Sequence, residues 1–298
     1  MRSPLAGIGI DVGGTKIWSI LGTEDGEIIA EQRMETEKTR DGFLRQLDAI
    51  VGGLTETALK MTGSKPVGIG IGLPGRVSVT TIEWVPNLPE LNGLNLQAIA
   101  LERWNMRIRL QNDGQLALLG EQWLGAARGA RSAVMLTLGT GIGGGIMING
   151  ELWSGFTGTA GSMGWITLDY KEDGDPERGW LERMISGTAI NRRASRLSVP
   201  RSSREWFEAA RTGDPEAIQL LRDVGHCLGT AIANLASVID PEIVVVGGGL
   251  SVELDTLMPH IREAVSRFAS PTARRVRIVP ARLLDKAGGF GALRLSFG

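Results

Sequence analysis

The sequence predicts an α/β protein built from two similar halves. Two glycine-rich turns, at residues 13–15 and 139–145, each lie between apolar runs of strand-type residues. The order of strands and helices expected before residue 112 restarts at Ala133. The chain has 298 residues, which suits two domains of roughly 100 to 200 residues each. A duplicated α/β fold accounts for all of these observations.

Composition narrows the class of protein further. Lys and Arg number 32 and Asp and Glu 33, so nothing indicates binding to nucleic acid or to an anionic membrane surface. Cys227 is the single cysteine, which excludes an internal disulfide, and two histidines leave little for a soft-metal site. No run approaches the roughly 18 apolar residues of a membrane span, and no leader is expected. We expect a soluble protein of the cytoplasm.

The first half is expected to run in the order strands, helix, strand, helix, strand, helix. Asp41 is a candidate N-cap for the first helix, and Pro74-Gly75 ends the strand that follows it. A loop rich in Pro and Asn separates that strand from the second helix. The expected elements are three antiparallel strands in 5–35, a helix over 41–62, a strand over 67–73, a helix over 96–104, a strand over 107–111 and a helix from Asn112-Asp113 to Trp123.

The second half begins with strands from Ala133 to Leu152 and contains a long insertion, 153–204. Asp214-Pro215-Glu216 is a strong helix start, because it combines an N-cap, Pro at the first position and an acidic first turn. The other expected elements are a helix over 206–212, a helix over 214–239, a buried strand over 243–246, a helix over 257–268, a strand over 276–279 and a final helix from 287. We therefore expect an N-terminal domain, 1–112, completed by the helix 287–298, and a C-terminal domain, 113–286.

Both glycine turns are candidate phosphate-binding hairpins, because turns of Gly, Thr and Gly can direct several backbone N–H groups at one anion. Asp11 stands where the first strand enters its turn, so its carboxylate could hold Mg²⁺ against phosphates, directly or through water. The alternative is a turn residue that bonds its own backbone. Lys16 is interpreted as a solvated strand residue.

Two other phosphate motifs do not fit. The run from Gly139 to Gly144 has the spacing G-x-G-x-x-G, but that fingerprint needs a helix to begin at the turn, and 145–150 indicates a strand and a second turn. The P-loop pattern G-x-x-x-x-G-K-[ST] does not occur in the chain. Phosphate binding is expected to be based on hairpins.

Asn112 and Asp113 lie between an expected strand and an expected helix. A carboxylate there leaves the carboxyl end of a strand, where open α/β sheets bind ligands, and could deprotonate an acceptor hydroxyl. The alternative is helix capping, which Asn and Asp favour. Both roles are compatible if Asn112 caps the helix and Asp113 faces a substrate.

A series of motifs, in order along 7–292, resembles the ROK family of bacterial sugar kinases and sugar-responsive repressors. These motifs are Asp11-Val12-Gly13-Gly14-Thr15-Lys16, Gly72-Leu73-Pro74-Gly75, Val85-Pro86-Asn87-Leu88, Asn112-Asp113 with Gly120-Glu121, 138–145, Gly158-Thr159-Ala160-Gly161, Ser186-Gly187-Thr188-Ala189, 246–249 and Gly288-Gly289-Phe290-Gly291-Ala292.

The resemblance implies an α/β fold of two ribonuclease-H-like, actin-like domains around a central cleft. It also implies ATP and Mg²⁺ as cofactors and phosphorylation of a hexose hydroxyl, usually the one on C6. Asp113 is then the base, Asn87 and Asn112 hold sugar hydroxyls, and a homodimer is suggested. The resemblance assigns nucleotide binding to Gly13, Gly14, Thr15, Gly139, Thr140, Gly141 and Gly248, with Asp11 as the Mg²⁺ residue.

One stretch departs from the family pattern. Where the kinases show E-x-G-H, this chain has Ser162-Met163-Gly164-Trp165, and where they show C-x-C-G-x-x-G-C-x-E it has 173–182 without any cysteine. We expect no zinc site, because Asp173 and Asp175 without His or Cys make a poor one. Trp165 and Trp180 are expected to form an apolar plug in its place, with sugar stacking by Trp165 as the alternative.

Glu182 survives from the second motif and is a candidate sugar-binding residue. The missing Glu and His put glucose itself in doubt, since each buried hydroxyl left without a partner costs roughly 1 to 3 kcal/mol. We expect an ATP-dependent sugar kinase. The alternatives are a pseudokinase or sensor that binds sugar without turnover, and a kinase that uses polyphosphate. A repressor is not expected, because the first strand begins within about seven residues of Met1 and leaves no room for a helix-turn-helix.

Overall fold

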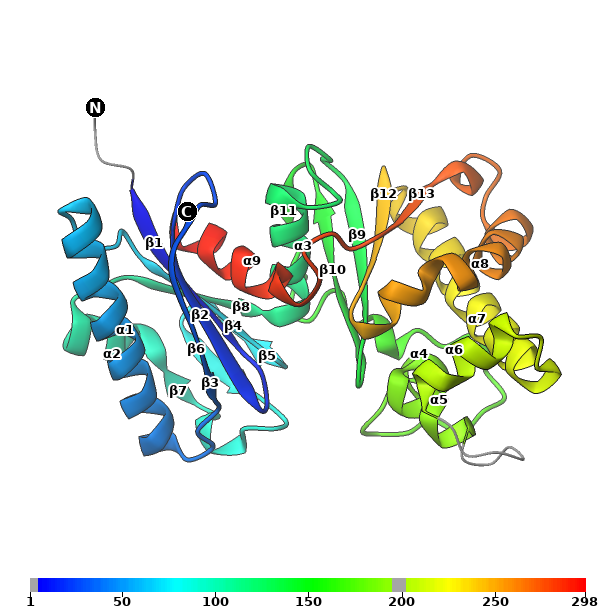
Figure 1. The fold of residues 1–298 in the computed structure, drawn as a ribbon, viewed down its shortest axis with the longest axis horizontal. Helices are drawn as coiled ribbons and strands as arrows, with labels where there is room; N and C mark the ends of the chain where they lie inside the picture. The colour runs from blue at the N-terminus through cyan, green and yellow to red at the C-terminus, as the bar shows by residue number, and fades with distance from the viewer. Residues whose placement is uncertain (1–4, 195–201) are drawn as a thin grey trace. The chain divides into compact units, whose positions relative to one another are not determined.

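A computed structural model describes residues 5–194 and 202–298, and it divides into two compact units (Figure 1). Unit 1 comprises 1–129, 152–160 and 285–298, and unit 2 comprises 130–151 and 161–284. Residues 195–201 of the expected insertion lie outside the described residues. Within the described part, no helix combines the length and the apolar character that crossing a bilayer requires.

Unit 1 is built on a five-stranded sheet in the order β3-β2-β1-β4-β8. Its strands are β1 (Ala6–Val12), β2 (Lys16–Thr23), β3 (Ile28–Glu35), β4 (Ile69–Leu73) and β8 (Ile108–Asn112). The first three are antiparallel neighbours, whereas β4 runs parallel to β1 and β8 runs parallel to β4. The three antiparallel strands expected in 5–35 are confirmed.

The alternating glycines of β1 and β4 determine which helices cover each face of this sheet. Their isoleucines, such as Ile10 and Ile71, are buried in a core that also contains Phe43 and Leu47 of α1 (Arg40–Thr62). On the glycine side α9 (Ala287–Ser296) lies directly on the strands, because a Cβ atom at Gly70 would lie 2.0 Å from the carbonyl oxygen of Ala292. Side chains on that side would push α9 away.

Helix α3 (Asp113–Leu124) also belongs to unit 1, so the unit boundaries differ from those expected at 112 and 113. The reason is close packing of α3 against α9. A Cβ atom at Gly120 would lie 2.3 Å from the carbonyl oxygen of Ala287, and one at Gly291 would lie 1.9 Å from that of Leu116. The segment 152–160, expected at the start of the insertion of the other domain, joins unit 1 as well.

The Pro- and Asn-rich segment after β4 is more regular than expected. It forms a small sheet of β5 (Arg76–Val77), β6 (Thr81–Trp84) and β7 (Leu94–Asn95), followed by α2 (Leu96–Trp104). Its two-residue strands are too short to leave a periodic signal. The first-helix N-cap also differs, since Thr39, not Asp41, accepts the N–H of Gly42.

Unit 2 repeats the strand order, as β11-β10-β9-β12-β13 (Figure 1). The strands are β9 (Ala133–Leu138), β10 (Ile142–Ile148), β11 (Glu151–Leu152), β12 (Ile243–Gly247) and β13 (Arg277–Pro280). Strand β10 is antiparallel to β9, whereas β12 is parallel to both β9 and β13. The same topology in both units supports the duplication inferred from the two glycine turns.

Helices complete unit 2. They are α4 (Trp180–Ile185), α5 (Gly187–Ala194), α6 (Ser203–Arg211), α7 (Pro215–Ile239) and α8 (Leu254–Phe268). Asp214 caps α7 as expected, accepting the N–H groups of Glu216 and Ala217. Helices α4 and α5, within the expected insertion, were not anticipated from the sequence.

Candidate active site

The first glycine hairpin joins β1 to β2. Gly13 donates its N–H to the carbonyl oxygen of Lys16 at 2.9 Å, which closes the turn. Thr36 braces it twice, because its hydroxyl donates to the carbonyl oxygen of Gly13 at 2.7 Å and its N–H donates to that of Thr15 at 3.0 Å. Among the described residues, no hydrogen bond uses the N–H groups of Gly14 and Thr15. Two adjacent donors therefore remain for an anion.

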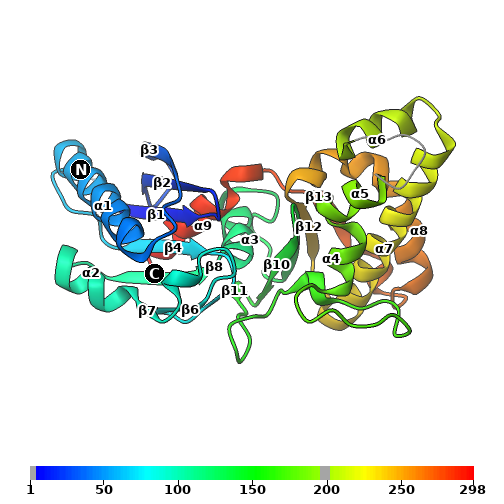
Figure 2. The ribbon, with the colours of Figure 1, turned by 90° about the horizontal axis from the view of Figure 1, so that it is seen from below.

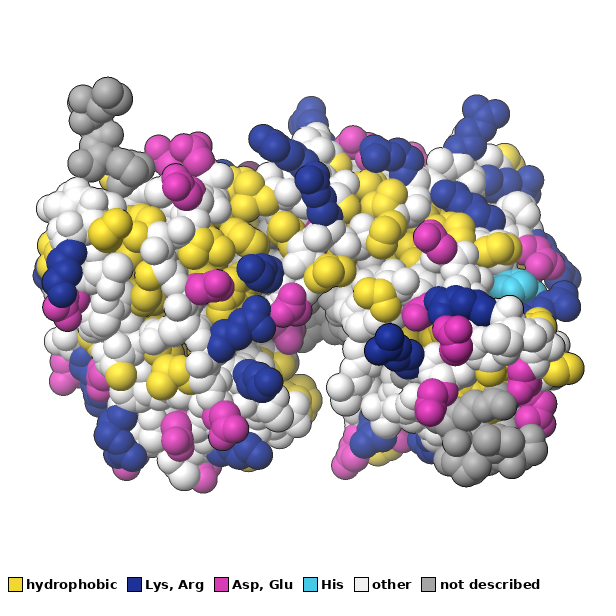
Figure 3. Space-filling model, viewed as in Figure 1, with side chains coloured by type: hydrophobic (Ala, Val, Ile, Leu, Met, Phe, Trp, Pro, Cys, Tyr) yellow, Lys and Arg dark blue, Asp and Glu magenta, His cyan; other side chains and the backbone are white. Residues whose placement is uncertain are grey.

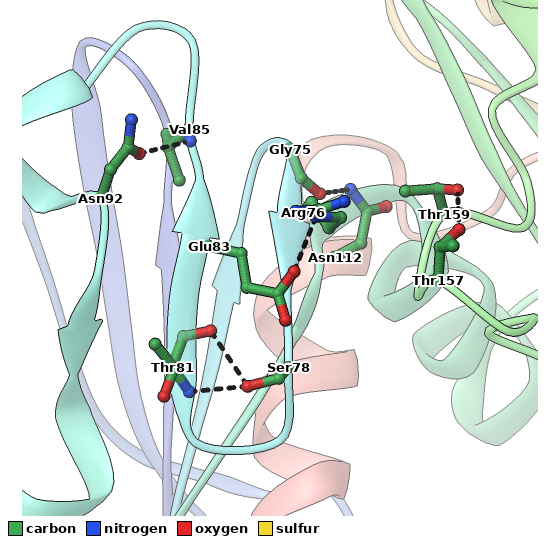
Figure 4. A network of polar contacts seen from close by, with 10 residues as sticks. All are labelled: Gly75, Arg76, Ser78, Thr81, Glu83, Val85, Asn92, Asn112, Thr157 and Thr159. Carbon is green, nitrogen blue, oxygen red and sulfur yellow. Dashed lines mark hydrogen bonds and ion pairs between the residues drawn. The ribbon is translucent and has the colours of Figure 1, made fainter.

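Asn87 lies against this hairpin, since a Cβ atom at Gly14 would lie 3.2 Å from the Cβ of Asn87. The loop that carries Asn87 is anchored by the buried side chains of Val85 and Leu88, while Asn87 itself is exposed. Asn92 fixes the start of the loop by accepting the N–H of Val85 at 2.8 Å (Figure 4). In the part of the chain that the structure describes, the side-chain amide of Asn87 therefore lies next to the first glycine hairpin without forming a hydrogen bond to it.

Asn112 connects β8 to α3 and is the N-cap of that helix. Its Oδ1 accepts the N–H groups of Gly114 at 2.9 Å and Gln115 at 3.2 Å, and its Nδ2 donates to the carbonyl oxygen of Gly75 at 3.0 Å (Figure 4). The capping alternative is therefore confirmed for Asn112. Asp113 is left as the next side chain at the carboxyl end of β8.

The carboxyl groups of Asp113 and Asp11 are electrostatically coupled. Burial raises the pKa of Asp113 above its usual range, against the opposing hydrogen bond from the N–H of Gly114 at 2.7 Å. Burial, followed by the charge of Asp113, raises the pKa of Asp11 to about 7. Buried carboxyl groups with raised pKa values at the end of a sheet have the properties of a general base and of a cation ligand.

Gly288, in the first turn of α9, keeps the space beside Asp11 open. A Cβ atom at residue 288 would lie 2.7 Å from Oδ2 of Asp11 and 3.1 Å from Oδ1. The carboxylate oxygens of Asp11 are hard donors of the kind that Mg²⁺ prefers, and the negative charge they share with Asp113 calls for a cation. The residues present therefore fit Mg²⁺. Gly288 was part of a family motif but was not among the residues expected at the site, because its contact with Asp11 arises only in the fold.

The second hairpin, in unit 2, joins β9 to β10. Gly139 donates its N–H to the carbonyl oxygen of Gly141 at 2.9 Å. Residues after α4 brace the turn, because Gly187 donates its N–H to the carbonyl oxygen of Gly139 at 2.9 Å and Thr188 donates its hydroxyl to that of Thr140 at 2.9 Å. As in the first hairpin, one N–H and one hydroxyl donate to two carbonyl oxygens of the turn, although here they come from two residues.

Glu182 supports this hairpin directly. Its Oε2 accepts the N–H of Ile142 at 2.8 Å, and a Cβ atom at Gly141 would lie 2.6 Å from the same oxygen. The structure thus shows a structural contact that was not expected of Glu182. Glu182 belongs to unit 2, whereas Asn87, Asn112 and Asp113 belong to unit 1.

Gly248 follows β12 with a φ of 79°, in the left-handed region that favours glycine. A Cβ atom there would lie 2.5 Å from the carbonyl oxygen of Leu138, at the end of β9. Gly248 therefore packs beside the strand that leads into the second hairpin. In unit 2 the structure brings together Gly248, the hairpin and Glu182.

The altered segment 162–182 corrects the expectation of a tryptophan plug. Trp180 is buried in the core of unit 2, but Trp165 is 55% exposed. A short 3-10 helix, Met163–Trp165, accounts for the difference, because it turns Met163 into the core and leaves Trp165 at the surface. Asp175 is engaged by its own turn and accepts the N–H groups of Glu177 and Arg178.

Gln115 is a buried polar residue that sequence analysis did not select. Its Nε2 donates to the carbonyl oxygens of Gly158 at 3.2 Å and Ala160 at 2.8 Å, and its Oε1 accepts the hydroxyl of Ser154 at 3.0 Å. These bonds hold the 152–160 loop against the first turn of α3, next to Asp113. A cavity of about 680 Å³ opens on the side of β8 that carries Gln111, and none of Asp11, Asn87 or Asp113 lines it.

Comparisons with known proteins show the family of the chain. The sequence model of the ROK family matches residues 7–297. A glucokinase of Halalkalibacterium halodurans is 34% identical over 287 residues, covering 89% of this chain and 86% of that protein. A xylose repressor of Caldicellulosiruptor bescii is 27% identical over 312 residues, covering 97% of this chain and 77% of that protein. The similarity extends to proteins named as enzymes and to proteins named as regulators.

Two solved structures are similar over almost the whole chain. The ROK hexokinase of Thermus thermophilus has a TM-score of 0.85 and 29% identity, with 98% of each chain covered. The ROK family glucokinase of Streptomyces griseus, solved with glucose and AMPPNP, has a TM-score of 0.78 and 29% identity, covering 98% of this chain and 99% of that one. The expected fold class, two α/β domains of the actin-like kind, is confirmed.

Proposed function

Because the chain belongs to the ROK family, we propose that it transfers the γ-phosphoryl group of ATP to a hydroxyl of a hexose or hexose derivative, at C6. The observation that carries this proposal is the placement of Asp113. Its carboxyl group follows β8 directly, has a raised pKa and is coupled to Asp11 beside a glycine hairpin. A base and a cation ligand next to a phosphate-type turn are the parts that phosphoryl transfer requires.

Asp113 is the proposed general base. It accepts the proton of the acceptor hydroxyl while the oxygen of that hydroxyl forms a bond to the γ-phosphorus and the bond to the leaving ADP oxygen breaks. Burial assists this role, because a carboxylate with a raised pKa holds a proton more readily near neutral pH. Asn112, by capping α3 and bonding Gly75, fixes the backbone that carries the base.

Asp11 is the proposed Mg²⁺ residue, with Gly288 leaving room for the ion's ligands. Bound Mg²⁺ would neutralise charge on the phosphates. The free N–H groups of Gly14 and Thr15, together with Gly13, form the first proposed phosphate contact. In unit 2, Gly139, Thr140, Gly141 and Gly248 form the second.

Asn87, Asn112 and Glu182 are the proposed sugar-binding residues. Asn87 has an exposed amide beside Gly14. Glu182 uses Oε2 for the hairpin, which leaves Oε1 for a sugar hydroxyl. Ser162 and Trp165 stand where the family pattern has a Glu and a His, so two hydrogen-bonding partners for sugar hydroxyls are missing. We therefore propose an acceptor other than unmodified glucose, one that has fewer hydroxyls in need of hydrogen bonds or carries an apolar substituent.

We propose that 162–182 holds no zinc, because Asp175 is already committed to its own turn and Trp165 occupies the histidine position. Dialysis against a strong chelator, without nucleotide, is expected to leave hydrogen exchange of this segment unchanged. Loss of protection there on chelation would contradict the proposal.

A sugar sensor without turnover is the second candidate, and the degenerate 162–165 motif is what favours it. The decisive experiment is steady-state turnover with ATP over hexoses, amino sugars and N-acetyl sugars, with polyphosphate as a second donor. We expect ADP release with at least one sugar and a C6 phosphate ester in the product. Saturable sugar binding without ADP release would favour the sensor, and turnover with polyphosphate alone would overturn the choice of donor.

A further inference from the structure

The two histidines of the chain lie far apart in sequence but side by side in the fold. His226 is on α7 and His260 is on α8, and their ring centroids are 5.6 Å apart at an interplanar angle of 84°. Figure 1 and Figure 2 show the two helices packed along each other in unit 2. This pair was not expected from the sequence, because two histidines were considered too few for a soft-metal site.

Glycines on α7 create the close approach. A Cβ atom at Gly225 would lie 2.6 Å from the Cβ of His260, and one at Gly229 would lie 2.6 Å from the carbonyl oxygen of Ile261. The backbone of α7 therefore rests directly on the base of the His260 side chain. Because both helices are long and packed on the core, the positions of the two imidazoles are fixed by rigid elements.

Glu263 completes a group of three donors. It lies one turn after His260 on α8, and its Oε2 is 3.0 Å from Nε2 of His226. One donor atom from each of the three residues lies within 4.8 Å of the other two. Both histidines are partly buried and Glu263 is exposed. Figure 3 shows a histidine side chain, in cyan, open to solvent beside acidic and basic side chains.

We propose that His226, His260 and Glu263 bind a divalent transition-metal ion, of which Zn²⁺ or Ni²⁺ are the probes to use. Imidazole nitrogens favour such ions over Mg²⁺ and Ca²⁺, which take oxygen ligands. Around one tetrahedral ion with bonds of roughly 2.0 to 2.2 Å, donor atoms lie roughly 3.3 to 3.6 Å apart. The present separations, which reach up to 4.8 Å, must shorten by side-chain rotation to give that geometry, and water would supply the remaining ligands.

The hydrogen bond between His226 and Glu263 explains why those two side chains lie together. It does not explain why His260 lies beside them. A metal site also predicts that a nearby positive charge weakens binding. Arg222 lies one turn before His226 and is close enough for its charge to act on both His260 and Glu263. A cation bound by the three donors would be repelled by Arg222, so removal of that charge should strengthen metal binding.

A metal here would link α7 to α8 and stabilise unit 2, and it would be separate from the Mg²⁺ proposed at Asp11 in unit 1. The site would thus give a bound metal control over stability that does not depend on the proposed kinase activity. Its test needs neither sugar nor nucleotide.

Calorimetric titration of the metal-free full chain with Zn²⁺ or Ni²⁺ tests the proposal, with Co²⁺ absorption as a probe of nitrogen ligation. We expect one saturable site per chain and a rise in melting temperature on loading. His226→Gln, His260→Gln and Glu263→Gln should each weaken binding by roughly ten-fold or more, Arg222→Gln should strengthen it, and the control Asp255→Asn on α8 should leave it unchanged.

Glu263 is exposed, so its substitution is expected to leave the fold intact. Glu263→Gln therefore still tests the site if a histidine variant proves unstable. No saturable binding to the parent chain would overturn the proposal. Equal affinity in the parent and Glu263→Gln chains, or no nitrogen signature with Co²⁺, would also overturn it.

Discussion

Asp11 on β1 and Asp113 at the start of α3 lie more than a hundred positions apart in sequence, yet the pKa of Asp11 is raised by burial and then by the charge of Asp113. Sheet order explains their proximity, because β4 lies between β1 and β8 and all three run parallel. Both carboxyl groups therefore emerge at the same edge. The coupling ties the stability of the metal-free protein to the groups proposed for catalysis.

The pKa of Asp11 predicts a pH-dependent stability. Since the pKa rises from 3.8 to about 7 on folding, the contribution of Asp11 to stability is fully present below pH 3.8 and is lost as the pH rises through 7. Without Mg²⁺ and nucleotide, the stability of Asp11→Asn relative to the parent should therefore rise by about 3 kcal/mol from pH 5 to pH 8.5. Urea unfolding at both pH values measures this.

The exposed carboxylate variant Asp25→Asn serves as the control and should show no such change. If the difference in unfolding free energy between Asp11→Asn and the parent does not depend on pH, the pKa of Asp11 is not raised in the folded chain.

Gly288→Ala tests the space beside Asp11. The new Cβ would lie 2.7 Å from Oδ2 of Asp11, so the carboxylate must move and kcat should fall roughly ten- to hundred-fold, with a higher Mg²⁺ requirement. Gly53→Ala is the matched control, since a Cβ there meets no atom within 4 Å and helix propensity favours Ala. If kcat of Gly288→Ala depends on Mg²⁺ concentration as in the parent, Asp11 is not the cation ligand.

Glu182→Gln separates the two roles given to Glu182. Replacing the charged acceptor of the Ile142 N–H weakens a bond worth about 1.5 to 3 kcal/mol, so the KM for ATP should rise roughly ten-fold. The KM for the accepted sugar should rise as well, if Oε1 contacts it. The exposed neighbour Glu177→Gln should change neither value. An unchanged sugar KM would strike Glu182 from the sugar site.

Much of the fold could be predicted because its signals are local. Asp214 before Pro215 marks the start of α7, and the glycine turns mark both hairpins. The small sheet β5-β6-β7 escaped prediction because two-residue strands carry no periodicity. Thr39 displaced Asp41 as the cap of α1, which shows that neighbouring polar residues compete for the same N–H groups.

The site was predictable where one segment supplies the chemistry and not where the fold assembles it. Asn112 and Asp113 stand together at a strand end and were selected from sequence. Gly288 and Gln115 were not, because their importance depends on contacts with Asp11 and with the 152–160 loop. Trp165 was assigned to the interior on its apolar character, but the backbone of 163–165 turns it outward.

Single-turnover and steady-state phosphorylation by Asp113→Asn, beside the parent chain and with the sugar it accepts, tests the central claim most directly. An amide keeps the shape and can still accept the N–H of Gly114, but it cannot take the proton of the acceptor hydroxyl. The account predicts a fall in kcat of ~10²- to 10⁴-fold, with sugar and ATP dissociation constants within a few-fold of the parent. A kcat within about three-fold of the parent would contradict it and leave Asp113 as a helix-start residue only.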